Sequence, residues 1–308
     1  MFIIEKDNQQ EKITINKLDS ILINPYVGIS GSVIELAITN NIDIIMIDKY
    51  GNPYGRFWSN KFGSTSKIRK NQLKICNSKL AFLIAKKFII NKLDNQILHL
   101  LEIYKKQKRE NNILVKSVNK INKCREKIIK IQTINKQLVR SYEGNAGKYY
   151  YRGLSSVLPE KIEIKRRSYR PAKDEINTLL NYGFGILYSK VEKACIVAGL
   201  DPSIGFFHED NYNKIPLVYD IIEKFRDTVY RSVYRSFTHK KVNKEWFLKK
   251  NNSFFLTKTG KDTFIKEFYK IYNAYYLYND RQEKMKNIIQ LECHKLAKIV
   301  LNAKSKKE

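Results

Sequence analysis

The pattern of the sequence changes near residue 59, and this change constrains the fold more than any other feature. The first 58 residues alternate short runs rich in Val, Ile and Thr with turn signals such as Asn24-Pro25 and Gly51-Asn52-Pro53. This alternation predicts a small, mostly β domain with one short helix over residues 32–40. Farther along, apolar residues recur every three or four positions over long segments, which predicts helices.

Residues 59–70 are polar and basic without periodicity, which predicts a linker. We therefore expect a multidomain α+β protein. A small N-terminal mostly-β domain covers residues 1–68 with the linker, and a larger all-α domain covers residues 69–308. A chain of 308 residues is long enough for two domains. The expected helices cover residues 73–103, with a weak point at Asp94-Asn95, then 113–138, 174–198, 216–230 and 282–301, and a short extended segment precedes a helix in FFLTKTGKDTFIKEF.

The charge is large and unevenly distributed. Lys and Arg number 58 against 30 Asp and Glu, a formal net charge of +28. Residues 1–58 carry 5 basic and 7 acidic side chains, whereas residues 59–140 carry 21 basic and 4 acidic ones. Such an excess indicates a polyanionic partner, with nucleic acid the first candidate and an anionic membrane the second. We expect the polyanion to bind mainly after the first domain.

The sequence also favours a soluble, intracellular and cytoplasmic protein without a membrane partner. No apolar run reaches the roughly 18 residues of a membrane span, and Met1 leads directly into a strand-like segment. The four cysteines, Cys76, Cys124, Cys195 and Cys293, lie far apart without zinc-type spacing. We expect them to be reduced thiols.

One histidine and three carboxylates form the candidate site. His208 precedes the helix expected over residues 216–230, which carries Asp220 and Glu223 three positions apart and therefore on one face. Glu143 stands among small residues in EGNAG, at the start of an apparent helix. Carboxylates beside a single imidazole suit a hard divalent ion such as Mg²⁺ or Mn²⁺. Such an ion polarises phosphoryl oxygens, while a basic surface holds the nucleic acid backbone.

A structural alternative stays open for each acid at this stage. Lys224 and Arg226 could neutralise Asp220 and Glu223 in a salt-bridged helix face. A glutamate at a helix N-terminus is favoured by the helix dipole, which would account for Glu143. The residues alone therefore do not decide between a metal site and an ordinary charged surface.

Three motifs in order carry a family resemblance. They are EGNAGKYYYRGL, then RRSYRPAKDEINTLLNYGFGILYSKVEKACIVAGLDPSIGFFHED, then IPLVYDIIEKFRD. This series resembles the CRISPR adaptation integrase family, the larger and nearly universal protein of spacer acquisition. The resemblance covers essentially the whole chain, and it implies a metal-dependent DNA endonuclease and integrase with a small β domain and a helical domain.

The resemblance implies roles for specific residues. Glu143, His208 and Glu223 would be the metal ligands, and Asp220 would line the same site behind them or as an alternative ligand. The family often has aspartate where Glu223 stands, which leaves open which of the two helix acids touches the ion. The residues implied as DNA contacts are Arg166, Arg167, Arg170, Asn177, Tyr188, Lys224 and Arg226.

The resemblance also implies partners and a reaction. Family members form homodimers through their β domains, and two dimers assemble on a small ferredoxin-like adaptation partner. The expected reaction inserts spacer DNA into a CRISPR array by attack of a 3′-hydroxyl on a phosphodiester. Two alternatives stay open: a standalone metal-dependent DNA nuclease of repair or a mobile element, and a non-catalytic nucleic-acid-binding protein.

Overall fold

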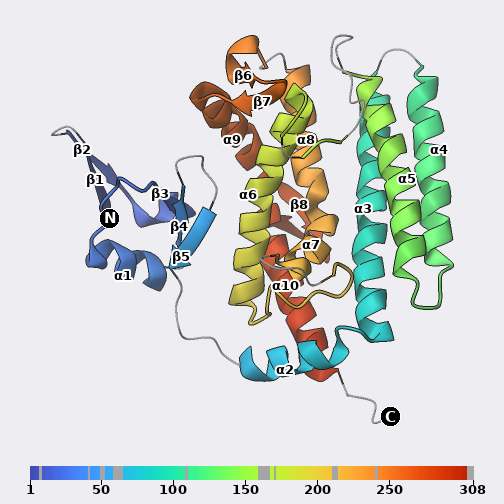
Figure 1. The fold of residues 1–308 in the computed structure, drawn as a ribbon, viewed down its shortest axis with the longest axis horizontal. Helices are drawn as coiled ribbons and strands as arrows, with labels where there is room; N and C mark the ends of the chain where they lie inside the picture. The colour runs from blue at the N-terminus through green and yellow to red at the C-terminus, as the bar shows by residue number, and fades with distance from the viewer. Residues whose placement is uncertain are drawn as a thin grey trace. The chain divides into compact units, whose positions relative to one another are not determined.

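The computed structural model describes residues 1–6, 9–40, 42–48, 53–57, 65–107, 110–158, 167–169, 171–209, 214–239 and 242–303. The chain divides into two units, Met1–Gly63 and Ser64–Glu308, slightly before the boundary predicted at residue 68. Strands dominate the first unit and helices dominate the second (Figure 1). This arrangement confirms the predicted fold class.

The first unit contains a hairpin and a three-stranded sheet. In the sheet, β3 runs parallel to β4, and β4 runs antiparallel to β5. Because parallel neighbours need a crossover, helix α1 connects β3 to β4. Ser30 caps α1 by accepting the Val33 N–H, which confirms the short helix predicted here. The elements are β1 (Phe2–Lys6), β2 (Gln9–Ile13), β3 (Ser20–Ile23), α1 (Gly31–Thr39), β4 (Asp43–Ile47) and β5 (Pro53–Phe57).

The second unit is a helical assembly around one large apolar core. Asp174 caps α6 by accepting the Asn177 N–H, and Gly199 follows the helix with a φ of 80°, as the sequence predicted. The helices are α2 (Thr65–Ile75), α3 (Lys79–Lys106), α4 (Asn112–Ile129), α5 (Lys136–Ser155), α6 (Glu175–Val197), α7 (Pro216–Ile222), α8 (Arg226–Thr238), α9 (Lys258–Tyr272) and α10 (Met285–Asn302), with 3₁₀ turns at Ile15–Lys17, Glu223–Phe225 and Lys244–Trp246.

Several helix boundaries differ from the predicted ones. Helix α2 occupies part of the predicted linker, because Ile68 and Ile75 are buried on one face of it. Helix α3 continues through Asp94-Asn95 without a break. The helix predicted over residues 113–138 ends at Ile129, and Asn135 starts α5 by accepting the Leu138 N–H. Glu143 consequently lies within α5 and not at a helix N-terminus, so a dipole role does not account for it.

The region predicted as one helix over residues 216–230 consists of α7, the 3₁₀ turn Glu223–Phe225 and α8.

Two hairpins also add strands to the region predicted as all-α: β6 (Phe247–Lys250) with β7 (Ser253–Leu256), and β8 (Tyr275–Tyr278) with β9 (Arg281–Lys284). Both turns place two residues at positive φ, Asn251-Asn252 and Asn279-Asp280. Asn and Asp tolerate that conformation, which two-residue hairpin turns favour.

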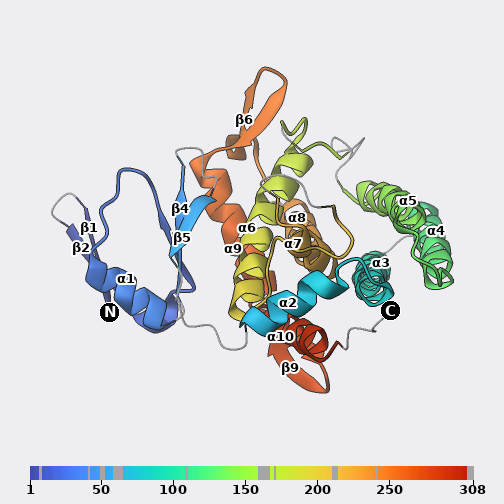
Figure 2. The same ribbon diagram turned by 60° about the horizontal axis from the view of Figure 1, so that its bottom comes forward.

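Helices α3, α4 and α5 pack side by side in both views (Figures 1 and 2). Helices α6, α8 and α9 pack together beside them, and α3 also contacts α7, α8 and the 3₁₀ turn. Of the predicted metal-site residues, Glu143 lies on α5, Asp220 on α7 and Glu223 in this turn, whereas His208 lies in the segment before α7. Within the described part of the chain, no helix is long and apolar enough to span a membrane.

Candidate active site

Asp220 on α7 positions His208. Its carboxylate is fully buried and accepts the backbone N–H groups of Phe206, Phe207 and His208 at 2.6, 3.0 and 3.1 Å. It also lies 2.6 Å from His208 Nδ1. Because an ionised carboxylate only accepts hydrogen bonds, Nδ1 carries the proton and the lone pair of neutral His208 lies on Nε2. The imidazole is 37% exposed, so this nitrogen stays accessible.

The loop before His208 is fixed by a close approach to α7. Pro216 stands in the first turn of α7, where its missing N–H needs no partner. A Cβ atom on Gly205 would lie 2.6 Å from the Pro216 Cβ, so only glycine fits there. The Leu217 N–H donates to the Pro202 carbonyl at 3.1 Å. These contacts bring residues 206–208 over the Asp220 carboxylate.

Arg140 on α5 holds the same loop from the other side. Its guanidinium donates to the Phe207 carbonyl at 3.0 Å and to Glu209 at 3.1 Å, and it lies 5.1 Å from the centre of the Phe207 ring. Sequence analysis did not single out Arg140. Its position three residues before Glu143 places both side chains on neighbouring turns of one helix.

Glu143 and Glu223 meet at Lys92, a residue of α3 that sequence analysis also missed. The Lys92 ammonium donates to Glu143 Oε1 and lies 2.7 Å from Glu223 Oε2. The lysine side chain is 6% exposed and that of Glu223 7% exposed, so the ion pair is buried. A signal was present: Lys92 occupies the buried face of α3 that also carries Ile89 and Leu93.

The charges at this cluster stabilise one another. Burial alone would raise the pKa of Glu223, but Arg226 and Lys92 outweigh it and lower this pKa to about 2. Burial disfavours the charged form of Lys92, yet Glu143 and Glu223 raise its pKa. Arg226 contacts Glu223 Oε1 at 2.7 Å. Glu223 is therefore a carboxylate at any physiological pH, and both basic groups remain cations.

Aromatic rings line the site beside His208. Tyr219 packs edge-on against His208, with ring centres 5.9 Å apart, and Tyr188 packs on Tyr219 at 5.3 Å. Arg226 lies 4.8 Å from the centre of the Phe184 ring. The predicted residues Tyr188 and Arg226 thus both lie at the site.

The remaining predicted DNA contacts are placed differently. Arg167 also approaches the Phe184 ring, but it donates to Asn177 Oδ1 at 2.8 Å. Asn177 is fully buried and organises the start of α6, so it is not placed to meet a phosphate. Lys224 pairs with Glu292 of α10 at 2.8 Å, which directs it away from Glu223. Arg166 and Arg170 lie outside the described residues.

The predicted metal ligands do not form a ready-made metal cluster. Among the described residues, no group of three or more His, Cys, Asp or Glu side chains is arranged to hold an ion. Instead, Lys92 bridges Glu143 and Glu223, and His208 is fixed by Asp220. Both Asp220 oxygens already accept hydrogen bonds, which leaves it no oxygen to act as an alternative ligand. Glu223 Oε2 is buried without a well-directed hydrogen bond and is the better-suited acid.

The fold and the site together define an α+β protein whose helical unit holds a partly exposed histidine, fixed by a buried carboxylate, and two glutamates bridged by a buried lysine. Residues 1–270 match the family model described as CRISPR associated protein Cas1. The chain therefore belongs to the Cas1 family, which confirms the resemblance found in its motifs.

Relatives and solved structures agree with this assignment. The chain is 32% identical to the CRISPR-associated endonuclease Cas1 1 of Archaeoglobus fulgidus over 262 residues, 80% of this chain and 76% of the relative. It is 25% identical to the CRISPR-associated endonuclease Cas1 of Thermotoga maritima over 300 residues, 96% and 90% of the two chains.

Two solved structures show the same fold. A CAS1 protein from Thermotoga maritima superposes with a TM-score of 0.74 at 24% identity, covering 99% of this chain and 93% of that one. A casposase bound to an integration product gives a TM-score of 0.67 at 22% identity, with 97% and 87% coverage.

Proposed function

We propose that the chain is a metal-dependent DNA endonuclease and integrase of CRISPR adaptation, which inserts new spacer DNA into the CRISPR array. The observation that carries the proposal is the convergence of Glu143 and Glu223 at Lys92, together with an imidazole before α7 that Asp220 holds in one tautomer. Family membership and relatives named as CRISPR-associated endonucleases support it.

Glu143, Glu223 and His208 would hold Mg²⁺ or Mn²⁺. Their chemistry fits a hard ion: Glu223 is ionised, its Oε2 lacks a well-directed hydrogen bond, and His208 offers Nε2. When bound, the ion would polarise a phosphoryl oxygen and stabilise charge on the attacking and leaving oxygens. Asp220 keeps the imidazole oriented by accepting from Nδ1.

The reaction needs no protein nucleophile, because the 3′-hydroxyl of the incoming DNA attacks. A P–O bond to that oxygen forms while the bond to the 3′-oxygen of the target strand breaks. The number of phosphodiester bonds is unchanged, so no nucleotide cofactor is consumed. The Arg226 guanidinium, buried beside Glu223, would add positive charge that stabilises the negative charge of the phosphate in the transition state.

We also propose that the protein binds DNA as a homodimer together with a small ferredoxin-like partner. Two further similar structures are described as complexes of Cas6-RT-Cas1 with Cas2, and one of them gives a TM-score of 0.78 at 20% identity, covering 99% of this chain and 33% of that chain. The low net charge of residues 1–58 suits a protein-facing surface on the first unit.

A strand-transfer assay tests the proposed reaction. His208→Ala should abolish Mn²⁺-dependent joining of a DNA fragment to repeat-containing plasmid, while duplex binding stays within about twofold of the unmodified protein. His294→Ala, which alters an exposed histidine of α10, serves as the matched control and should join DNA normally. Undiminished joining by His208→Ala would contradict the proposal. Cutting without joining, with the small partner present, would favour a standalone nuclease, and neither activity would favour a binding protein.

A further inference from the structure

Lys92 lies between two acids that are proposed here as metal ligands. Its ammonium contacts one oxygen of Glu143, from α5, and one oxygen of Glu223, from the 3₁₀ turn after α7. Without a cation between them, these carboxylates would repel one another in a site largely closed to water. The bridge therefore balances the charge of the metal-free site.

Lys92 is placed to compete with a metal and not to assist it. An ammonium and a divalent ion need the same carboxylate oxygens, and one cannot approach closely while the other stays. A buried lysine carries a desolvation cost that only good ion pairs offset, so the pairs explain why it points inward. Its four-carbon side chain is flexible enough to leave without movement of α3.

The two acids would respond unequally to the loss of this bridge. Glu223 keeps a second partner, because Arg226 contacts its other oxygen at 2.7 Å. For Glu143, Lys92 is the ion-pair partner found within the described residues. Displacement of the ammonium would therefore leave Glu143 in need of a new cation, while Glu223 stays partly neutralised.

We propose that Lys92 is a built-in placeholder, which holds the site together without metal and gives way when a divalent ion binds. This inference rests on the proposed metal-dependent function and adds a step to it: metal entry requires the ammonium to leave. Metal affinity is then set by the exchange of one cation for another and not by the acids alone.

Mn²⁺ titration of the full-length protein by electron paramagnetic resonance tests the inference without DNA. Lys92→Met should bind Mn²⁺ at least tenfold more tightly than the unmodified protein and should have a lower melting temperature in EDTA. Arg226→Met is the matched control, because it removes an equally close charge from Glu223 without opening the space between the acids. It should tighten binding much less. Lys92→Gln, an uncharged side chain that still donates hydrogen bonds, serves if Lys92→Met fails to fold.

The outcomes separate the inference from the function on which it rests. If Lys92→Met and Lys92→Gln bound Mn²⁺ no more tightly than the unmodified protein, the placeholder role of Lys92 would be wrong. The proposed metal site would be unaffected by this result. If the Lys92 and Arg226 variants gained the same Mn²⁺ affinity, the gain would come from the loss of any nearby positive charge. This result would also overturn the placeholder role of Lys92. Failure of Mn²⁺ to bind any variant, the unmodified protein included, would overturn the proposed metal site itself.

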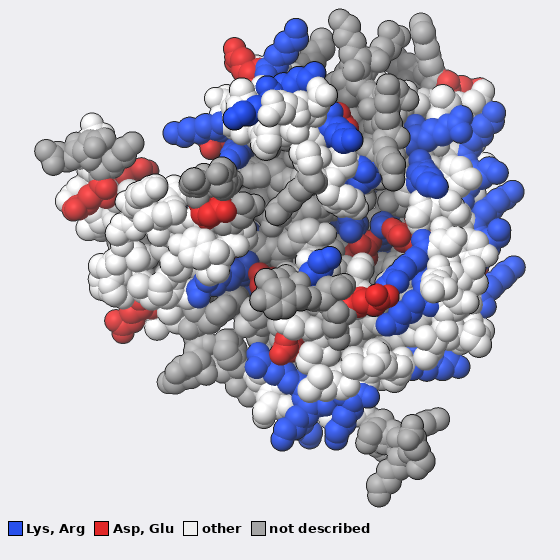
Figure 3. Space-filling model, in the orientation of Figure 1, with Lys and Arg blue, Asp and Glu red and all other residues white. Residues whose placement is uncertain are grey.

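An independent observation concerns the outer face of α4. Its buried side is formed by Leu114, Ser117, Ile121, Cys124 and Ile128. Exposed lysines repeat at spacings of four and three residues along another side: Lys116, Lys120, Lys123, Lys127 and Lys130. We call these five side chains the α4 lysine row. None of them forms an ion pair with another described residue, and basic side chains line the edge of the molecule formed by α4 (Figures 1 and 3).

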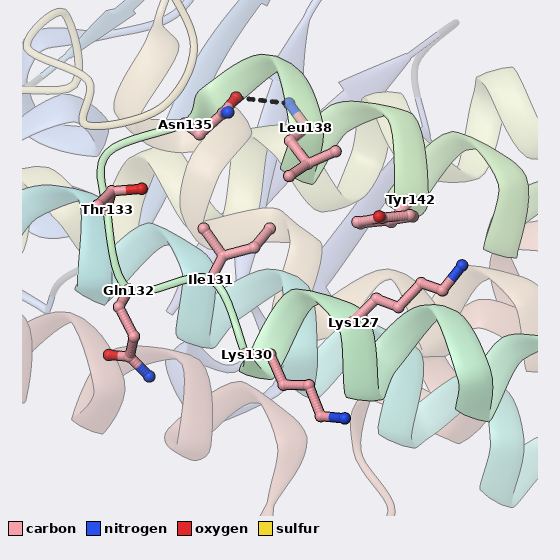
Figure 4. Close-up of a pocket in the computed structure, with 8 residues that line it drawn as sticks. All are labelled: Lys127, Lys130, Ile131, Gln132, Thr133, Asn135, Leu138 and Tyr142. Carbon is pink, nitrogen blue, oxygen red and sulfur yellow. Dashed lines mark hydrogen bonds between the residues drawn. The ribbon is translucent and has the colours of Figure 1, made fainter.

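The row ends at a hollow of about 420 Å³ at the tip of the α4–α5 hairpin. Lys127 and Lys130 line it together with Tyr142, whose ring centre lies 5.3 Å from the Lys127 ammonium (Figure 4). At 1.5 Å per residue, the row extends over about 20 Å, comparable to about six base pairs of duplex. Regularly spaced lysines offer point charges to phosphates without reading bases.

We propose that the α4 lysine row is a track for the backbone of duplex DNA, separate from the candidate active site. Its side chains point away from the buried seam of α4, whereas Lys92 and Glu143 meet on the α3–α5 side. A duplex on this track would be bound by charge alone. The row would therefore hold DNA independently of its sequence and of any metal.

Salt-dependent binding of a 20-base-pair duplex, followed by fluorescence anisotropy, tests this track. Replacement of Lys116, Lys120, Lys123 and Lys127 by glutamine should reduce the magnitude of the slope of log K against log salt by about 3.6, since each phosphate contact contributes about 0.9. The control replaces four exposed lysines from four different elements, β2, α2, α9 and α10: Lys12, Lys70, Lys258 and Lys295. Equal slope changes in both variants would overturn the track, as would loss of binding to anionic lipid vesicles without loss of DNA binding.

Discussion

The replacement Asp220→Asn offers the sharpest test of how the site is organised. An amide can keep its oxygen where Oδ2 accepts from Phe206 and Phe207, but its NH₂ group then faces His208. The backbone N–H of His208 loses its acceptor. His208 Nδ1 can pair with the new NH₂ group only as an acceptor, which moves the ring proton to Nε2. The variant should therefore fold with the wrong tautomer.

The structural cost can be worked from these contacts. The orphaned N–H costs about 1 to 3 kcal/mol, and the loss of charge from the remaining bonds adds about 1 kcal/mol. For a unit of this size each kcal/mol lowers the melting temperature by about 2 to 4 °C, so a decrease of about 4 to 16 °C is expected. Asp201→Asn is the matched control. The Asp201 side chain is 29% exposed, and its Oδ1 accepts the backbone N–H of Ser203. This replacement should shift the melting temperature by only a few degrees.

Two measurements check the reasoning. Thermal unfolding gives the loss of stability, and nitrogen-15 NMR of the histidine side chains gives the tautomer of His208. Mn²⁺ should also stabilise the unmodified protein but not Asp220→Asn. An unchanged melting temperature together with a proton still on Nδ1 would refute the role assigned to Asp220.

The remaining predictions concern packing and pH. A Cβ on Gly260 would lie 2.5 Å from the Trp246 carbonyl oxygen, so Gly260→Ala should cost about 1 to 3 kcal/mol of unfolding free energy in denaturant titrations. Gly185→Ala, which meets open space in α6, should instead stabilise by about 0.5 to 1 kcal/mol. Burial raises the pKa of Asp227 to about 6, against an ordinary value of 3.8. The raised pKa of Asp227 adds to the free energy of unfolding below pH 4, and this stabilisation is lost as the pH rises through 6. Asp227→Asn should therefore remove up to about 3 kcal/mol of the change in unfolding free energy between these pH values. Stabilisation by Gly260→Ala, destabilisation by Gly185→Ala or an unchanged pH profile would contradict these expectations.

The sequence predicts the elements whose signals are local. The change near residue 59, the Asp174 cap and Gly199 led to the two-unit fold and to α6 as observed. The extended segment and helix predicted in FFLTKTGKDTFIKEF correspond to β7 and α9, but the pairing of β7 with β6 and the β8–β9 hairpin were not predicted, because these strands are only four residues long. Helix α2 was predicted in part as a linker because its sequence is mostly polar, and the burial of Ile68 and Ile75 becomes visible only in the folded unit.

The candidate site was predicted in part. Motif order pointed to Glu143, His208 and Glu223 as metal ligands, which stays a prediction, and the structure brings Glu143 and Glu223 together at Lys92. The spacing of Asp220 and Glu223 did not predict that Asp220 would bind His208 while Glu223 binds Lys92, because a uniform helix places both acids on one face. The 3₁₀ turn at Glu223–Phe225 breaks that uniformity. Lys92 and Arg140 act through contacts between distant helices, which no local pattern specifies.

The four bonds to Asp220 have a consequence for how the site can move. They attach His208 to α7, and Glu223 follows directly at the end of the same helix. His208 and Glu223 are therefore both held next to α7, and Arg140 and Lys92 join this region to α5. A movement of α5 relative to α7 would have to break the contacts of Arg140 with this loop and the bridge that Lys92 makes between Glu143 and Glu223.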